Sequence, residues 1–215
     1  MLKPLALLAC VLWQGNGAHA QQAPARPEPL QLRMSPQLDE RILPEQRNAS
    51  PTFVSGERLS AQTDSELVLE GKVQLRRPEL VIQADRMEYD QARDLVRAQG
   101  HVRINQTGDV FEGTALQLKV DTFEGFLNEA SYMLRANEAH GEAQRIDFLD
   151  DKRAVVSNAT FTTCQRLPGA DWMPDWLLSA GTLRFDSEEE AAEAEDVTLT
   201  FKSVPVLALS SMNFP

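Results

Sequence analysis

Histidine and cysteine are scarce in this chain of 215 residues, which contains three histidines and two cysteines. His101 and His140 stand alone in strand or turn contexts, and Cys10 falls in an apolar segment at the N-terminus. Metal sites in proteins group such side chains at short, characteristic spacings. The sequence therefore predicts no metal site, and nothing in it calls for a cofactor.

Catalytic motifs and a basic stripe are also missing. The sequence has no Gly-x-Ser-x-Gly, no Gly-rich loop ahead of a helix and no cluster of histidines, so we predict that the chain is not an enzyme. Its formal net charge is −11, whereas nucleic-acid-binding proteins gather Lys and Arg on one face. We therefore expect no nucleic-acid partner.

Long apolar runs are limited to the N-terminus, and no later stretch reaches the roughly 18 apolar residues of a membrane-spanning helix. Residues 1–20 combine Lys3, an apolar segment and the small-x-small site Ala18-His19-Ala20. These are the three parts of an export signal, so we predict a signal peptide cleaved after Ala20. The alternative is a lipoprotein signal that is acylated at Cys10.

The segment that follows, residues 21–55, contains six prolines among polar residues and shows no sustained periodicity. Such a segment cannot bury enough apolar surface to offset the entropy lost on ordering. We predict a flexible, proline-rich leader over residues 21–55 and folded sequence from Gly56 onward.

One short pattern then occurs four times: a small residue, two variable residues, and apolar, polar and apolar residues, usually followed by Asp. Alternation with a period of two is typical of a β-strand whose alternate side chains share one face. The four copies are Ala84–Asp90, Ala115–Asp121, Ala143–Leu149 and Ala180–Asp186.

A second set of alternating segments answers the first, and polar turn residues separate each copy from its answer. These segments are Ala98–Ile104, Asn128–Leu134, Ser157–Phe161 and Glu195–Phe201, with a further one upstream at Leu67–Leu75. Two strands joined by a polar turn form a β-hairpin. The sequence thus predicts an all-β fold of repeated antiparallel hairpins. Its apolar interior is either filled by side chains, as in a sandwich, or open as a trough.

Two parts of the chain resemble a known family. Gln83–Asp90 followed by Ala98–Val102 is similar to the OstA/LptA-type repeat of lipopolysaccharide transport proteins. The ordered set Cys164, Pro174-Asp175-Trp176, Val204-Pro205-Val206 and Phe214-Pro215 resembles the junction between the periplasmic domain and the outer-membrane barrel of LptD-like proteins. On this resemblance we expect a periplasmic jellyroll over residues 56–203, and a junction over 204–215 towards a barrel outside this chain.

The resemblance implies a V-shaped β-jellyroll of two sheets, exported to the periplasmic face of the outer membrane, whose apolar interior carries lipopolysaccharide acyl chains. Alternation assigns the inward side chains, and a one-residue bulge would reverse any strand. The lipid-contact residues expected in this way are Met87, Tyr89, Val102, Ile104, Leu118, Val120, Tyr132, Ile146, Phe148, Phe161, Leu183, Phe185, Leu199 and Phe201.

The resemblance also implies partners. The strand near Leu67–Leu75 is the expected edge for pairing with a periplasmic LptA-like bridge protein. An LptE-like lipoprotein would bind only through the barrel. Cys164 would form a disulfide with a cysteine outside this chain, although a buried, unpaired cysteine is the other interpretation. A stand-alone LptA-like bridge protein and a structural β-sandwich without lipid are the alternative functions.

Overall fold

The computed structural model describes residues 50–214 except for residues 62–64, 167–171 and 190. The predicted signal peptide and residues 21–49 of the predicted leader lie outside the described residues. The described part contains no helix that is long and apolar enough to cross a membrane. Its regular structure consists of strands.

Twelve strands follow one another along the chain, and each of the nine segments predicted to be a strand lies in or largely within one of them. Most are longer than predicted because they begin earlier in the chain than the repeat pattern indicated. Their bounds are β1 Phe53–Ser55, β2 Arg58–Ala61, β3 Glu66–Arg77, β4 Leu80–Asp90, β5 Leu95–Gln106, β6 Asp109–Lys119, β7 Gly125–Met133, β8 His140–Phe148, β9 Arg153–Phe161, β10 Trp176–Asp186, β11 Ala191–Phe201 and β12 Val204–Phe214.

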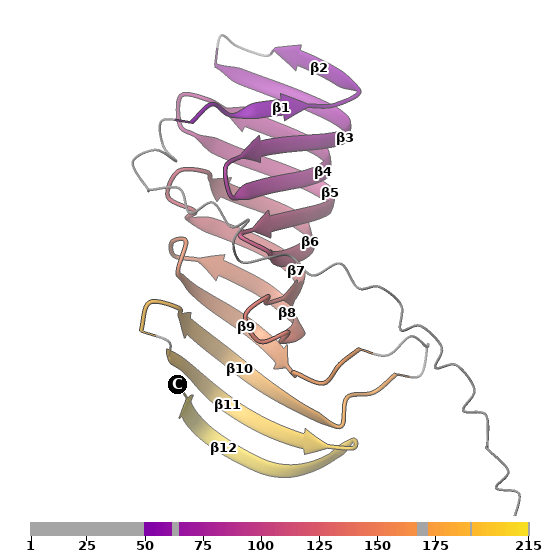
Figure 1. Ribbon diagram of the computed structural model, residues 1–215, viewed down its shortest axis with the longest axis vertical. Coiled ribbons are helices and arrows are strands. Elements are labelled where there is room, and N and C mark those ends of the chain that lie inside the picture. Colours follow the sequence, from indigo (N-terminus) through magenta and orange to yellow (C-terminus); the bar gives the residue numbers. More distant parts are fainter. Residues whose placement is uncertain (1–49, 62–64, 167–171, 190, 215) are drawn as a thin grey trace, which may run out of the picture. The chain divides into compact units, whose positions relative to one another are not determined.

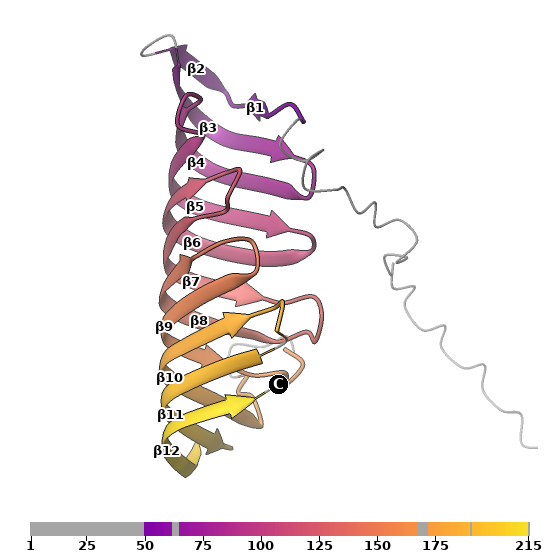
Figure 2. The same cartoon turned by 90° about the vertical axis from the view of Figure 1, so that its left-hand side faces the viewer.

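These strands form one antiparallel sheet in which each strand from β3 to β12 pairs with its neighbours in sequence (Figure 1). β1 and β2 both pair with the outer edge of β3. The all-β jellyroll prediction is confirmed, and the two expected sheets prove to be the two walls of a single folded sheet. Figure 2 shows the strands curling back along one side of the sheet, so that the walls lie on either side of an interior.

The sheet bends along a line, called the fold line here, that runs through the middle of the odd-numbered strands from β3 to β11. Each of β3, β5, β7, β9 and β11 contains one non-glycine residue with a positive φ angle near this point. In the first two of these strands a glycine with positive φ precedes that residue, and the register with the neighbouring strands shifts, as at a β-bulge. The residues with positive φ are Lys72, His101, Glu129, Asn158 and Asp196.

Gly100 shows why this position is demanding. Its φ angle is +73°, and a Cβ atom there would lie 2.4 Å from Asp85 Oδ2. The next residue, His101, places its Nδ1 2.7 Å from the same carboxylate. This hydrogen bond, and then the charge of Asp85, raise the pKa of the exposed His101 imidazole above its ordinary value.

Replacing Asp85 by asparagine is expected to lower the pKa of His101 towards its ordinary value of about 6.5. Because the pKa of His101 is raised in the folded protein, the pair of His101 and Asp85 contributes its full stabilisation at pH values below the ordinary pKa of histidine. The contribution is lost as the pH rises through the raised pKa. An NMR titration of the His101 imidazole in both proteins measures the change. An equal pKa in the two proteins would show that the pair does not form in solution.

The structure corrects the predicted bounds of the folded domain at both ends. β1 lies within the predicted flexible leader, and β12 lies within the predicted junction, yet both pair with the sheet. The predicted edge strand is also wrong, because β3 pairs with β1 and β2 on one side and with β4 on the other. A short alternating run such as Phe53–Ser55 gives too little periodicity to be recognised beside prolines.

Candidate functional site

The inward side chains of the β3–β6 half fill the space between the two walls. All six residues predicted to face inward in this half are at most 6% exposed, and they belong to one apolar cluster. They are Met87, Tyr89, Val102, Ile104, Leu118 and Val120. In this half the interior is a packed core, as an ordinary β-sandwich would have.

The β7–β11 half is packed less completely. Tyr132, Ile146, Phe148 and Leu183 are buried. Phe161 and Phe185 are only partly buried, although both pack against the apolar cluster. Leu199 is also partly buried. Phe201 is 50% exposed, although it lies opposite Trp176 in the register of β10 and β11 and so shares the face of a side chain that packs against the apolar cluster.

A cavity of about 700 Å³ opens between the walls in this second half. It gathers five of the residues predicted to face inward: Tyr132, Ile146, Phe148, Phe161 and Phe185. Further apolar lining comes from residues outside the predicted lipid contacts, namely Phe111, Phe123, Leu134, Ala154, Val156 and Ala192. The other nine predicted residues do not line this cavity.

Three phenylalanines form the wall of the cavity on its β6 side. The Phe148 ring stands edge-on to Phe111, with centroids 5.3 Å apart, and to Phe123, with centroids 5.0 Å apart. Such geometry is favourable for aromatic pairs. Phe111 begins β6 and Phe148 ends β8, so this contact joins residues near opposite ends of their strands across the interior. The alternation in β6 could have identified Phe111, whereas Phe123 lies in a turn with a positive φ angle and leaves no periodic signal.

Tyr132 presents its ring to the cavity but not a free hydroxyl group. That hydroxyl donates a 2.6 Å hydrogen bond to the carbonyl oxygen of Thr160 in β9. The bond passes over β8 at Gly141, where a Cβ atom would lie 1.8 Å from the same oxygen. Burial raises the pKa of Tyr132, so the hydroxyl stays neutral at physiological pH.

Charged residues surround the open side of the cavity. Asp109, Asp150, Lys152, Arg153 and Asp186 contribute to its lining. Arg153 Nη2 lies 2.6 Å from Asp150 Oδ2, and the two side chains are 55% and 29% exposed. The arrangement is amphipathic, with an apolar interior and a hydrated, charged rim.

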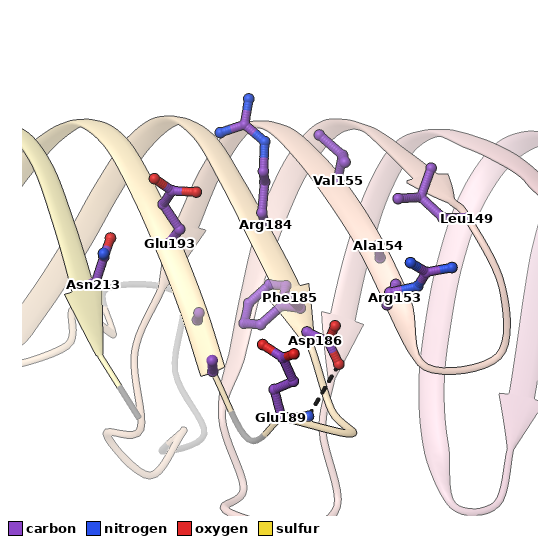
Figure 3. A pocket seen from close by; sticks show the side chains of 12 residues that line it. Leu149, Arg153, Ala154, Val155, Arg184, Phe185, Asp186, Glu189, Glu193 and Asn213 are labelled. Atoms are coloured by element: carbon purple, nitrogen blue, oxygen red, sulfur yellow. Dashed lines mark hydrogen bonds between the residues drawn. The ribbon is translucent and has the colours of Figure 1, made fainter.

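A second hollow of about 620 Å³ lies at the β8–β9 and β10–β11 turns (Figure 3). Phe185 lines both hollows. Around it the second hollow has charges of both signs, among them Arg184, Asp186 and Glu193. Figure 3 shows the exposed Arg184 pointing away from Phe185, on the other face of β10. Mixed charges around a single aromatic ring favour no particular ligand, so the larger cavity is the better candidate site.

Cys164 follows β9 and is free and partly buried. The hydroxyl group of Thr162 lowers the pKa of its thiol. Among the described residues, no group of three or more His, Cys, Asp or Glu side chains could hold a metal ion.

Sequence comparison relates the chain to known proteins. Residues 54–126 match the family described as "LptA/(LptD N-terminal domain) LPS transport protein". The chain is 51% identical over 215 residues to an LPS-assembly protein LptD of Albidiferax ferrireducens, and 46% identical over 212 residues to one of an Acidovorax species. Each alignment covers 99% of this chain but only 27% and 25% of the relative, so the chain spans about a quarter of the curated relatives' length.

The comparison with solved structures matches LptH from Pseudomonas aeruginosa, described as the LptA-homologous periplasmic component of the lipopolysaccharide transport device. It is 10% identical, with a TM-score of 0.30, over 69% of this chain and 85% of LptH. On the sequence matches, the chain belongs to the LptA/(LptD N-terminal domain) family of LPS transport proteins.

Proposed function

We propose that the folded sheet carries lipopolysaccharide and that the cavity between its walls holds part of the lipid's acyl chains. The supporting observation is the apolar cavity of about 700 Å³, a volume within the range of about 300–1,000 Å³ common for ligand sites. Burying acyl methylene groups gains about 0.8 kcal/mol each, so a dozen give roughly 10 kcal/mol. The charged rim keeps the polar head group in water.

The function needs no chemical step in this chain. The residues that line the cavity act by excluding water from acyl chains, and the Tyr132 hydroxyl is engaged by a backbone carbonyl. The energy for moving lipid through the interior comes from another component of the transport system. Since the relatives are named LPS-assembly proteins, we assign the chain to the periplasmic side of the outer membrane.

The N-terminal edge of the described sheet is the proposed site for a bridge partner. β1 and β2 occupy this edge, and their side chains are mostly exposed, with Phe53 at 65% and Leu59 at 62%. Exposed edge strands pair with strands of other chains. A periplasmic LptA-like jellyroll added here would extend the sheet and its interior. The proposed disulfide of Cys164 and contacts with an LptE-like lipoprotein would involve segments outside this chain.

The packed β3–β6 half favours the alternative of a filled β-sandwich for that part of the molecule. The cavity of about 700 Å³ is lined mainly by residues from β7 to β11 and the turns beside them, with Gln106, Asp109 and Phe111 from β5 and β6. A test must therefore compare positions inside the cavity with positions on the outer face of the same strands.

Photo-crosslinking to purified lipopolysaccharide provides this test. A photoreactive phenylalanine analogue replaces Phe148 or Phe185 in turn, and the matched controls carry it at the adjacent, outward Asp147 or Arg184. We expect adducts at the two phenylalanine positions and at least a tenfold lower yield at the controls. Folded protein that gives no adduct at Phe148 and Phe185, or equal yields inside and outside, would refute the proposed function.

A further inference from the structure

The side chains beside the two ends of β4 meet each other. β4 has 11 residues, and a strand rises about 3.3 Å per residue, so a straight β4 would be roughly 36 Å long. Arg77 pairs with Leu80 at one end of β4, and Asp94 directly precedes β5 at the other end. Arg77 Nη1 nonetheless lies 3.6 Å from Asp94 Oδ2. The strand has therefore folded back, and the two walls touch across the open side of the interior.

We call the polar residues at this contact the mouth cluster: Thr52, Arg77, Tyr89, Asp94 and Asp121. Arg77 also forms an ion pair with Asp121 through Nη1, and its Nε donates a 2.8 Å hydrogen bond to Thr52. Asp94 accepts hydrogen bonds from the Tyr89 hydroxyl at 2.9 Å and from the backbone N–H of Asp121 at 2.6 Å. The cluster thus joins β3 on one wall to the β4–β5 and β6–β7 turns on the other.

Its charges are largely withdrawn from water. The side chains of Arg77 and Asp94 are 10% and 19% exposed. Removing one partner of such a pair leaves an uncompensated charge, whereas replacing pairs by apolar groups of similar size can be nearly neutral in stability. Ion pairs are therefore not needed to keep the mouth closed. What distinguishes the cluster is that its two ion pairs, Arg77 with Asp94 and Arg77 with Asp121, break when the walls separate.

The interior behind the mouth cluster has no space for an acyl chain. Met87, Ile104 and Leu118 are each 0% exposed. Lipid can enter this half only if the two walls part. Because Arg77 lies on one wall and both carboxylates lie on the other, any such parting breaks the ion pairs of Arg77 with Asp94 and Asp121.

We propose that the mouth cluster is a latch that holds the β3–β6 half closed and opens when lipid passes between its walls. This inference rests on the proposed lipid-carrying function and adds a control point to it. The latch gives the interior two states at its N-terminal half, closed and packed or open and lipid-filled. The β7–β11 half keeps its cavity in both.

Distances between spin labels across the mouth test the latch. Labels are attached to cysteines at the exposed positions Ala92 and Thr107, in the full chain with Cys10→Ser and Cys164→Ser. The parent should give one narrow, short distance population, and Arg77→Met should add a longer one. The matched control is Arg103→Met, because Arg103 pairs with Glu112 on a neighbouring strand and not across the mouth. Circular dichroism verifies folding, and Asp121→Asn, a milder change at a side chain 41% exposed, replaces Arg77→Met if that variant does not fold.

Adding purified lipopolysaccharide separates this inference from the proposed function. If both the latch and the proposed function hold, lipopolysaccharide increases the distance between the two labels in the parent protein. It also forms crosslinks at Phe148. If Arg77→Met or Asp121→Asn opens the mouth but lipid neither shifts the distance nor crosslinks, the latch stands and the proposed function fails. Distances that are unchanged in both variants overturn the latch. Crosslinking at Phe148 without any lipid-induced change in the label distance overturns the latch as a gate and leaves the proposed function intact.

Discussion

Replacing Gly141 by alanine is expected to lower the free energy of unfolding by about 3 kcal/mol, the upper end of the range for overpacking. The new Cβ atom would lie 1.8 Å from the carbonyl oxygen of Thr160 and 2.7 Å from its carbonyl carbon. These are backbone atoms of β9 and cannot rotate away as a side chain would. The clash must move β8 from β9 and break the hydrogen bond from Tyr132. Equilibrium unfolding in urea measures the effect.

Gly56→Ala is the matched control for this substitution. A Cβ atom at Gly56 would meet the Leu69 Cβ at 3.5 Å, which is ordinary van der Waals contact, and no positive φ is recorded there. Alanine also reduces the conformational entropy of the unfolded chain, and this effect then dominates. We therefore expect the free energy of unfolding to rise by about 0.4–1 kcal/mol. Equal stabilities of the two variants would show that β8 and β9 do not approach as closely in solution as in the structure.

Alternation in the sequence predicted the inward side chains best where two walls face each other. In β4 the residues Met87 and Tyr89 follow the bend, and nothing interrupts the period of two before the strand ends. Both are buried as expected. In β11 the same reasoning placed Phe201 inside, but burial requires more than a direction. Phe201 is half-exposed although Val197, in the same strand and between the same neighbouring strands, is buried.

The fold line could be predicted only in part. Gly71 and Gly100 mark it in β3 and β5 by their positive φ angles, which glycine adopts readily. In β7, β9 and β11 the corresponding residues are Glu129, Asn158 and Asp196, and only Asn and Asp carry a modest preference for that conformation. The sequence therefore predicts the hairpins, whereas the angle of the bend depends on how the side chains of the two walls pack against each other.

The contacts across the interior could not be predicted from the sequence. Arg77 and Asp121 are separated by 44 residues, and Phe111 meets Phe148 from another hairpin. Such pairs depend on how far each strand folds back, which no local pattern encodes. For the same reason, periodicity could not distinguish a filled sandwich from an open trough, and the structure contains both, one in each half.

This difference between the halves predicts unequal effects of truncation. Ile104→Ala is expected to lower the free energy of unfolding by about 4 kcal/mol, within the range of about 2–5 kcal/mol for large-to-small changes in packed cores. Ile104 is 0% exposed, and both walls surround it, so the change leaves a new void. Urea unfolding of this variant and of Phe161→Ala gives the comparison.

Phe161→Ala removes more atoms than Ile104→Ala but should lower the free energy of unfolding by less, about 2 kcal/mol. Truncating a phenylalanine in a packed core costs about 3–5 kcal/mol. The Phe161 ring is partly buried and faces the cavity, so it already lacks packing partners on that side. A loss for Phe161→Ala as large as that for Ile104→Ala would mean that the β7–β11 half is packed in solution. The site for acyl chains would then be absent from the closed protein, and lipid would have to open both halves.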